Sequence, residues 1–117
     1  MKGAESGQGQ AGVRARALAT ALTALAPRLP RFEREAVLDR ARASPGLRHA
    51  APENAAWLAL VALARHAFTE YDALLEDGYD RDSARFFVLD DLNAVLAGWG
   101  VRRTVSGEEI EEGDAEL

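Results

Sequence analysis

A repeating pattern of large side chains between residues 57 and 75 constrains the fold of this chain more than any other feature. Apolar residues recur there at alternating intervals of four and three, namely Trp57, Val61, Ala64, Phe68, Tyr71 and Leu75. Because an α-helix has about 3.6 residues per turn, this spacing aligns the side chains on one face. We therefore expect one long helix over about 52–76, with this face buried.

A second helix with a matching face is expected directly after it. The same spacing is repeated by Val88, Leu92, Val95 and Trp99. Gly78 is suited to cap the end of the long helix, and Asp80 can begin the next one by accepting a backbone hydrogen bond from two or three residues further on. Since a short connection places consecutive helices antiparallel, we predict a helical hairpin with Trp57 and Trp99 in its core.

Two further helices precede the hairpin. Four leucines at alternating spacing predict the first, over about 12–26: Leu18, Leu22, Leu25 and Leu29. Pro30 suits the first turn of the second, RFEREAVLDRARA, and Ser44-Pro45-Gly46 ends it. The fold class is therefore predicted to be all-α, a small four-helix domain over residues 11–101 that is centred on a long antiparallel helical hairpin.

The two ends of the chain have compositions typical of tails. Residues 1–10 are rich in Gly and Gln without hydrophobic periodicity, and residues 102–117 are strongly acidic, so both are predicted to be disordered. The chain has no cysteine, which excludes disulfides and thiolate metal sites. No signal-peptide pattern and no apolar run of roughly 18 residues occurs, so we expect a cytoplasmic protein without membrane contact.

Charge is distributed unevenly along the sequence. The net charge is -5, but residues 1–50 carry nine Lys/Arg against four Asp/Glu, and residues 51–101 carry three against nine. One interpretation is that the two halves neutralise each other on folding. The other is a basic face for a polyanion, with the acidic C-terminal tail as its competitor.

The run RHAFTEYD places polar residues on a flank of the long helix. Thr69 can return its hydroxyl hydrogen bond to the backbone carbonyl of Arg65. A pair between Asp72 and Arg85 of the next helix would set the register of the hairpin. This structural interpretation is favoured over contact with a ligand.

His66 lies among alanines on the back of the expected long helix. It can pack against the N-terminal helices, contact a partner or nucleic acid, or take part in metal binding or catalysis. His66 and Glu70 are four residues apart, yet two histidines and no cysteine make a poor zinc set, so no metal or cofactor is expected. Catalysis would need an acid within hydrogen-bond reach, which the geometry of a continuous helix disfavours for His66 and Asp72.

Phe86 lies far round its helix from the predicted buried face. Either the first two helices cover it, which we expect, or it belongs to a dimer or partner surface. The two alternatives differ in whether its ring is exposed.

The run R-H-x-x-T-x-Y-D-x-L-L, followed by A-R-x-x-V and V-L-x-x-W, resembles an uncharacterised family of bacterial and fungal proteins known only as a domain of unknown function. The likeness covers about residues 29–99 and has no activity attached to it. It implies one constellation of Arg65, His66, Thr69, Tyr71, Asp72 and Arg85. Relatives have a Gly/Arg segment before the long helix and more arginines on the last one. This chain has SPGLRHAAPEN, Phe87 and Leu89 instead, which weakens a nucleic-acid role and is consistent with a surface that meets protein.

Three functions are considered. The first is a non-catalytic nucleic-acid-binding module that uses arginines of the basic half, with Arg14, Arg16 and Arg28 beside Arg31, Arg34, Arg40, Arg42, Arg48, Arg65 and His66. The second is a protein-interaction or self-association module that uses the back of the long helix or Phe86. An enzyme built on His66 ranks third, and no small-molecule substrate is inferred. The first two differ in whether the arginines share an open face or pair with acids of their own helix.

Overall fold

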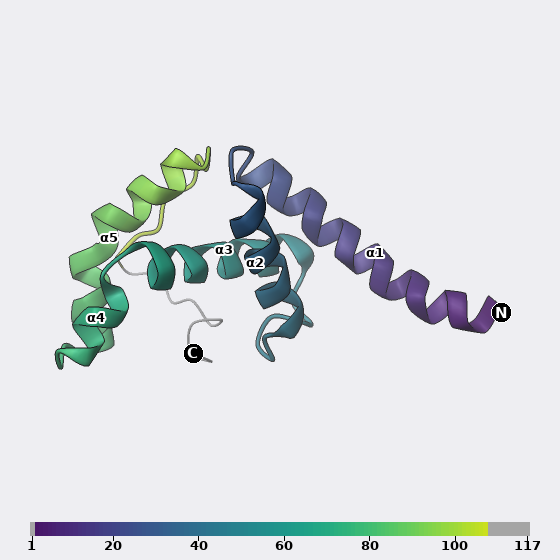
Figure 1. The fold of residues 1–117 in the computed structure, drawn as a ribbon, viewed down its shortest axis with the longest axis horizontal. Helices are drawn as coiled ribbons and strands as arrows, with labels where there is room; N and C mark the ends of the chain where they lie inside the picture. Colours follow the sequence, from purple (N-terminus) through teal and green to yellow (C-terminus); the bar gives the residue numbers. More distant parts are fainter. Residues whose placement is uncertain (1, 108–117) are drawn as a thin grey trace.

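Five α-helices account for most of residues 2–107, the part of the chain that the computed structural model describes (Figure 1). Within these residues there is no strand, so the all-α prediction is confirmed. No helix in this part of the chain is both long and apolar enough to cross a membrane. The helices are α1 (Lys2–Leu25), α2 (Arg31–Ala43), α3 (Pro52–Phe68), α4 (Tyr71–Glu76) and α5 (Arg81–Gly98).

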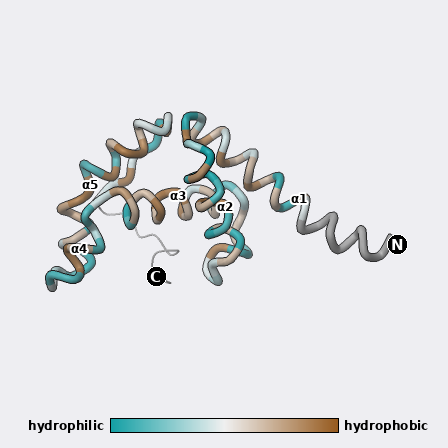
Figure 2. Tube along the Cα trace, in the orientation of Figure 1, coloured by the Kyte–Doolittle hydropathy of each residue, from teal (hydrophilic) through white to brown (hydrophobic). Residues whose placement is uncertain are grey.

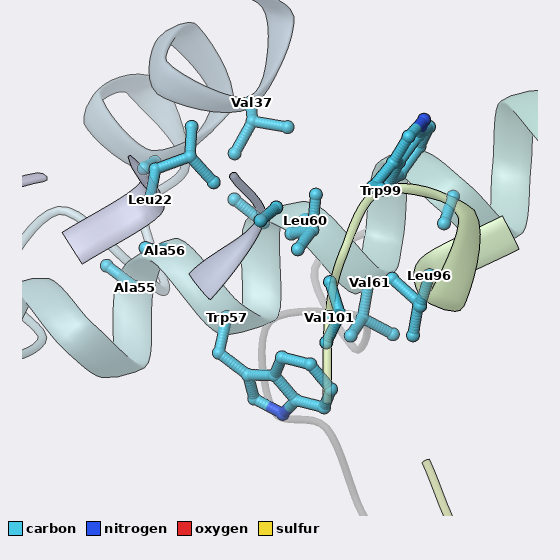
Figure 3. Packing of buried hydrophobic residues seen from close by; sticks show 14 of the residues in the cluster. Leu22, Val37, Ala55, Ala56, Trp57, Leu60, Val61, Leu96, Trp99 and Val101 are labelled. Atoms are coloured by element: carbon cyan, nitrogen blue, oxygen red, sulfur yellow. The ribbon is translucent and has the colours of Figure 1, made fainter. Parts of the chain in front are cut away.

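Helix α3 is the centre of the fold, because it packs against each of the other four helices. Its sequence is apolar around most of its circumference, and a helix of that kind must be covered on several sides. Hydrophobic residues predominate along α3, whereas α2 is mostly hydrophilic (Figure 2). The buried cluster shown in Figure 3 accordingly joins side chains from four helices, among them Leu22, Val37, Leu60, Val61 and Leu96.

The prediction of a single helix over 52–76 is wrong. Helix α3 ends at Phe68 and α4 begins at Tyr71, because Thr69 adopts an extended conformation with φ −134° and ψ 175°. The antiparallel hairpin therefore consists of the short α4 and the long α5, and α3 leaves it at an angle (Figure 1). The expected four helices become five, and the centre moves from the hairpin to α3.

The two caps predicted for the hairpin turn are confirmed. Gly78 has φ +102°, and its N–H donates to the carbonyl of Leu75 while the N–H of Tyr79 donates to that of Leu74. These two bonds make a Schellman motif, which needs a residue in the left-handed region. At the start of α5, Asp80 Oδ1 accepts from the Ser83 N–H at 2.7 Å.

The N-terminal helix is longer than expected. It begins at Lys2 instead of near Gly12, so residues 2–10, for which a tail was expected, are helical. No proline interrupts the chain before Pro27, and proline is the strongest helix breaker. Leu18 and Leu22 are fully buried, as the leucine spacing predicted.

The prediction of a tail from residue 102 is wrong for residues 102–107. Together with Val101 these residues form a segment, here called the strap, that lies against the core with Val101 and Val105 buried. The side-chain amide of Asn93 donates to the Val105 carbonyl at 3.0 Å and accepts from the Val105 N–H at 2.8 Å. The guanidinium of Arg103 stacks 4.0 Å above the ring of Trp57. The rest of the expected tail, 108–117, lies outside the described residues.

A second left-handed glycine ends α5. Gly100 has φ +89°, its N–H donates to Ala97, and the N–H of Val101 donates to Leu96. The turn between α1 and α2 contacts this end of α5, since the Arg28 N–H donates to the carbonyl of Trp99 at 2.9 Å. The end of α5 is thereby attached to the turn between α1 and α2.

Gly100→Ala is expected to lower the free energy of unfolding by about 1–3 kcal/mol, the usual cost of the left-handed region for a residue with a Cβ. The new Cβ would also lie 3.0 Å from Cγ and Cδ of Pro27. Gly98→Ala is the control, because Gly98 is helical with open space around it, and there alanine should stabilise by about 0.5–1 kcal/mol. Urea denaturation of both variants measures the difference, and equal effects would contradict the analysis.

The cap at Asp80 predicts a dependence of stability on pH. Hydrogen bonds from the backbone and side chain of Ser83 hold the pKa of the Asp80 carboxyl below its ordinary 3.8. The carboxylate therefore stabilises the fold above that ordinary value, and this stabilisation is lost as the pH falls through the lower folded pKa. The cost of Asp80→Ala in urea denaturation should accordingly shrink towards pH 2–3.

Asp80→Asn is the control for this measurement, because an asparagine can also cap the helix but does not titrate. The difference in stability between Asp80→Asn and Asp80→Ala should therefore stay constant with pH, because neither side chain titrates. A cost of Asp80→Ala that stays constant from pH 7 to pH 2 would contradict the assignment.

Candidate functional site

The break between α3 and α4 is built by Thr69. Its hydroxyl donates to the carbonyl of Arg65, as predicted from the sequence, and its oxygen accepts from the N–H of Tyr71 at 3.2 Å. One side chain thus satisfies a carbonyl at the end of α3 and an N–H at the start of α4. Such local bonds compete with the helix and favour its interruption.

The break brings His66 and Asp72 together. His66 Nδ1 lies 2.6 Å from Asp72 Oδ1, and because the carboxylate can only accept, the ring carries its proton on Nδ1. The expectation that helix geometry keeps these residues apart is wrong. It assumed a continuous helix, in which residues six apart are separated by about 9 Å along the axis and point in different directions.

Tyr71 packs between the two basic residues of the motif. Its ring meets that of His66 edge to face with centroids 5.2 Å apart, and the Arg65 guanidinium carbon lies 5.7 Å from its centroid. Tyr71 and Arg65 are 3% and 2% exposed. Arg65 therefore belongs to the interior and is not available to a surface that binds nucleic acid.

The structure brings five residues of the sequence motif into one cluster, here called the hinge cluster: Arg65, His66, Thr69, Tyr71 and Asp72. Arg85, the sixth, is half-buried and lines a small cavity together with Arg65, Asp82 and Phe86. The predicted pair between Asp72 and Arg85 stays a prediction, whereas the partner that the structure records for Asp72 is His66.

The hinge cluster has one chemically notable part, the histidine held by a carboxylate. Such a pair orients the base in many hydrolases, but there it acts on a nearby nucleophile. The adjacent hydroxyl, that of Thr69, is already bonded at both helix ends. No group of three or more His, Cys, Asp or Glu in residues 2–107 could hold a metal ion. The cluster's recorded contacts join the end of α3 to the start of α4.

Three arginines of the basic half hold elements of the fold together. Arg14 donates to the Leu47 carbonyl at 3.0 Å, Arg34 to Ala19 at 3.1 Å and Arg28 to Ala97 at 3.1 Å. Each bond crosses from one element to another, so sequence periodicity could not reveal it. Arg42 instead pairs with Asp39 of its own helix at 2.7 Å, with both side chains exposed.

The candidate nucleic-acid residues therefore divide into two groups. Arg34, Arg42, Arg65 and His66 have partners within the protein or are buried. The others lie on the surface of α2 and of the turn after it, with Arg31 and Arg48 exposed and Arg40 half-buried. Arg16, on α1, is also exposed.

The expectation that α1 and α2 cover Phe86 is wrong. Phe86 is 73% exposed, because both helices pack at the other end of α3 from the α4–α5 turn (Figure 1). It forms an exposed aromatic cluster with Tyr79 and Phe87, whose ring centroid lies 5.4 Å from that of Tyr79 and 5.9 Å from that of Phe86. The sequence signalled only that Phe86 was left off the buried face.

A double-mutant cycle measures what the contact between His66 and Asp72 contributes. His66→Ala, Asp72→Ala and the double variant should give a coupling free energy of about 0.5 kcal/mol, since the side chains are 23% and 57% exposed and the pair is partly screened. A cycle between His66 and the exposed Asp77 is the control and should be additive. Additive effects for Asp72 as well would show that the contact does not hold the hinge.

Comparison with known proteins places the sequence in a family. The sequence profile of DUF2293, described as an uncharacterised conserved protein, matches residues 21–100, which include the hinge cluster and Trp99. No curated protein matches the chain. No solved structure matches it either. The match covers α2 to α5 with the end of α1, more than half of the chain, and the protein therefore belongs to the DUF2293 family.

Proposed function

We propose that the protein is a non-catalytic nucleic-acid-binding module whose contact surface is the basic side of α1, α2 and the turn after α2. The observation that supports this is the separation of charge in space. Residues 12–50 carry eight arginines against three acidic residues, while residues 69–100 carry eight acidic residues against two arginines. Helices α1 and α2 lie at one end of α3, and α4 with the start of α5 at the other (Figure 1).

The proposed contacts come from four arginines on the surface of the basic end: Arg16, Arg31, Arg40 and Arg48. None of their side chains has a hydrogen bond or ion pair with the described residues. An arginine can bind a phosphate through two parallel N–H groups, which favours a sugar–phosphate backbone over a single small anion. Contacts of this kind are independent of base sequence.

The acidic chain end enters the proposal as a competitor. Residues 108–117 contain six acidic residues, and their charge would compete with phosphates for the same arginines. Removal of the chain from residue 102 would not test this, because residues 101–107 pack against the core. Neutral substitutions in the full-length chain keep the strap in place.

Fluorescence anisotropy tests the proposal with labelled single-stranded DNA, duplex DNA and RNA at 25–200 mM salt. Four phosphate contacts on a duplex predict a slope of about −3.6 for log K against log salt concentration. The triple variant Arg31→Gln/Arg40→Gln/Arg48→Gln should bind at least tenfold more weakly and lose most of that slope. Arg81→Gln, an exposed arginine of α5, removes charge at the acidic end and should bind like the wild type.

A second arm of the experiment addresses the chain end. Glu108, Glu109, Glu111 and Glu112 are all replaced by Gln, which should tighten binding at low salt and have less effect at 200 mM. Absence of salt-sensitive binding to every probe, or a triple variant that binds as well as Arg81→Gln, would contradict the proposal.

A further inference from the structure

We propose that the aromatic cluster of one chain binds the outer face of α2 in a second copy, so that chains associate head to tail. The cluster consists of Tyr79, Phe86 and Phe87, which are 46%, 73% and 57% exposed. At roughly 150–250 Å² per aromatic side chain, the three rings present on the order of 300–400 Å² of apolar surface. A contiguous apolar patch of that size is often functional.

Acidic residues frame the aromatic cluster. Asp82 and Asp90 lie four residues before and after Phe86, so each is one helical turn away on the same face, and Asp91 has the same relation to Phe87. All three are exposed. A symmetric contact between two aromatic clusters would bring these carboxylates against their own copies, and such like-charge contacts cost several kcal/mol in interfaces. The complementary surface must therefore be basic.

The outer face of α2 has the complementary properties. A groove between α2 and α3 is lined by Ala36, Ala43, Pro45 and Leu63, with Arg40 at its edge. It continues towards Arg31 and Phe32, whose ring is 80% exposed. Two acids line this surface: Asp39, which is paired with Arg42 at 2.7 Å, and Glu35 beside Arg31 and Phe32. The surface thus combines a floor of small apolar side chains, which can accept a phenyl ring, with arginines that can meet the aspartates of α5.

One chain cannot join its own two surfaces, because α2 and the α4–α5 turn lie towards opposite ends of α3 (Figure 1). A contact between copies is consequently heterologous, and each added chain leaves one aromatic cluster and one groove open for the next. The small apolar area places the contact among weak interfaces. We expect association at tens to hundreds of micromolar, weakened by salt. Arg31 and Arg40 belong to the proposed nucleic-acid surface as well, so association is measured without nucleic acid and its outcome is separate from that proposal.

Sedimentation equilibrium of the full-length protein at 10–500 µM, in low salt and in 0.5 M salt, tests the proposal. The cluster variant is Phe86→Ser/Phe87→Ser, and the groove variant is Phe32→Ser/Arg40→Glu. The control is Val13→Ser/Arg16→Glu, which removes an exposed apolar residue and an exposed arginine from α1. The wild type and the control should associate equally, and both site variants should be at least tenfold weaker.

An equimolar mixture of the two site variants decides the geometry. The groove variant still has its aromatic cluster, and the cluster variant still has its groove, so the mixture should form a dimer that cannot extend. A mixture that stays monomeric would overturn the proposal, as would a wild type that is monomeric at 500 µM in low salt. A groove variant that associates like the wild type would show a symmetric contact instead, which also overturns it.

Charge reversal provides a second route that leaves every aromatic residue in place. Asp82→Lys/Asp90→Lys and Arg31→Glu/Arg40→Glu should each lose association alone and regain it on mixing, since the signs are exchanged across the interface. Circular dichroism establishes that each variant is folded. Failure of the exchanged pair to associate, with both partners folded, counts against the proposed contact between the ends.

Discussion

The need to cover α3 on nearly every side governs the rest of the structure. Alanines and larger apolar residues of α3 lie on most sides of the helix, and burying them away from water is favourable. No single neighbour can bury them all, and therefore α1, α2 and α5 all pack on it while the strap covers what they leave open near Trp57. The many alanines allow these elements to approach closely, so a thin set of helices suffices to form the main core. Tyr71, Ala84 and Val88 form a second, smaller cluster between α4 and α5.

Local sequence signals identified most of the elements, because they report interactions between near neighbours in the chain. The buried faces of α1 and α5 follow from residue spacing, and the caps at Gly78 and Asp80 follow from side-chain chemistry within one turn. The break at Thr69 was missed for a physical reason. Phe68 and Tyr71 continue the four-three spacing across it, so the pattern is the same whether or not the backbone is interrupted. The hydrogen bonds of Thr69 to both helices favour the interruption of the backbone.

The candidate site was harder to predict, because it depends on which elements lie side by side. Periodicity put His66 and Asp72 on different faces, and only the altered direction of α4 joins them. The arginines looked alike in sequence, yet Arg14, Arg28 and Arg34 are bonded to carbonyls 15 to 69 residues away and others face solvent. The spacing showed that Phe86 lies off the buried face of its helix. Whether another helix covers its ring depends on how the helices pack together.

The strap has a consequence for the residues that follow it. The side chain of Asn93 binds both the N–H and the carbonyl of Val105, and Gly107 lies beside Leu89 of α5. The position of the chain is therefore fixed as far as Gly107. Ten further residues span at most about 35 Å when fully extended. The attachment at Gly107 therefore sets an upper limit on the distance that their six carboxylates can reach, and this limit does not change when the protein is diluted.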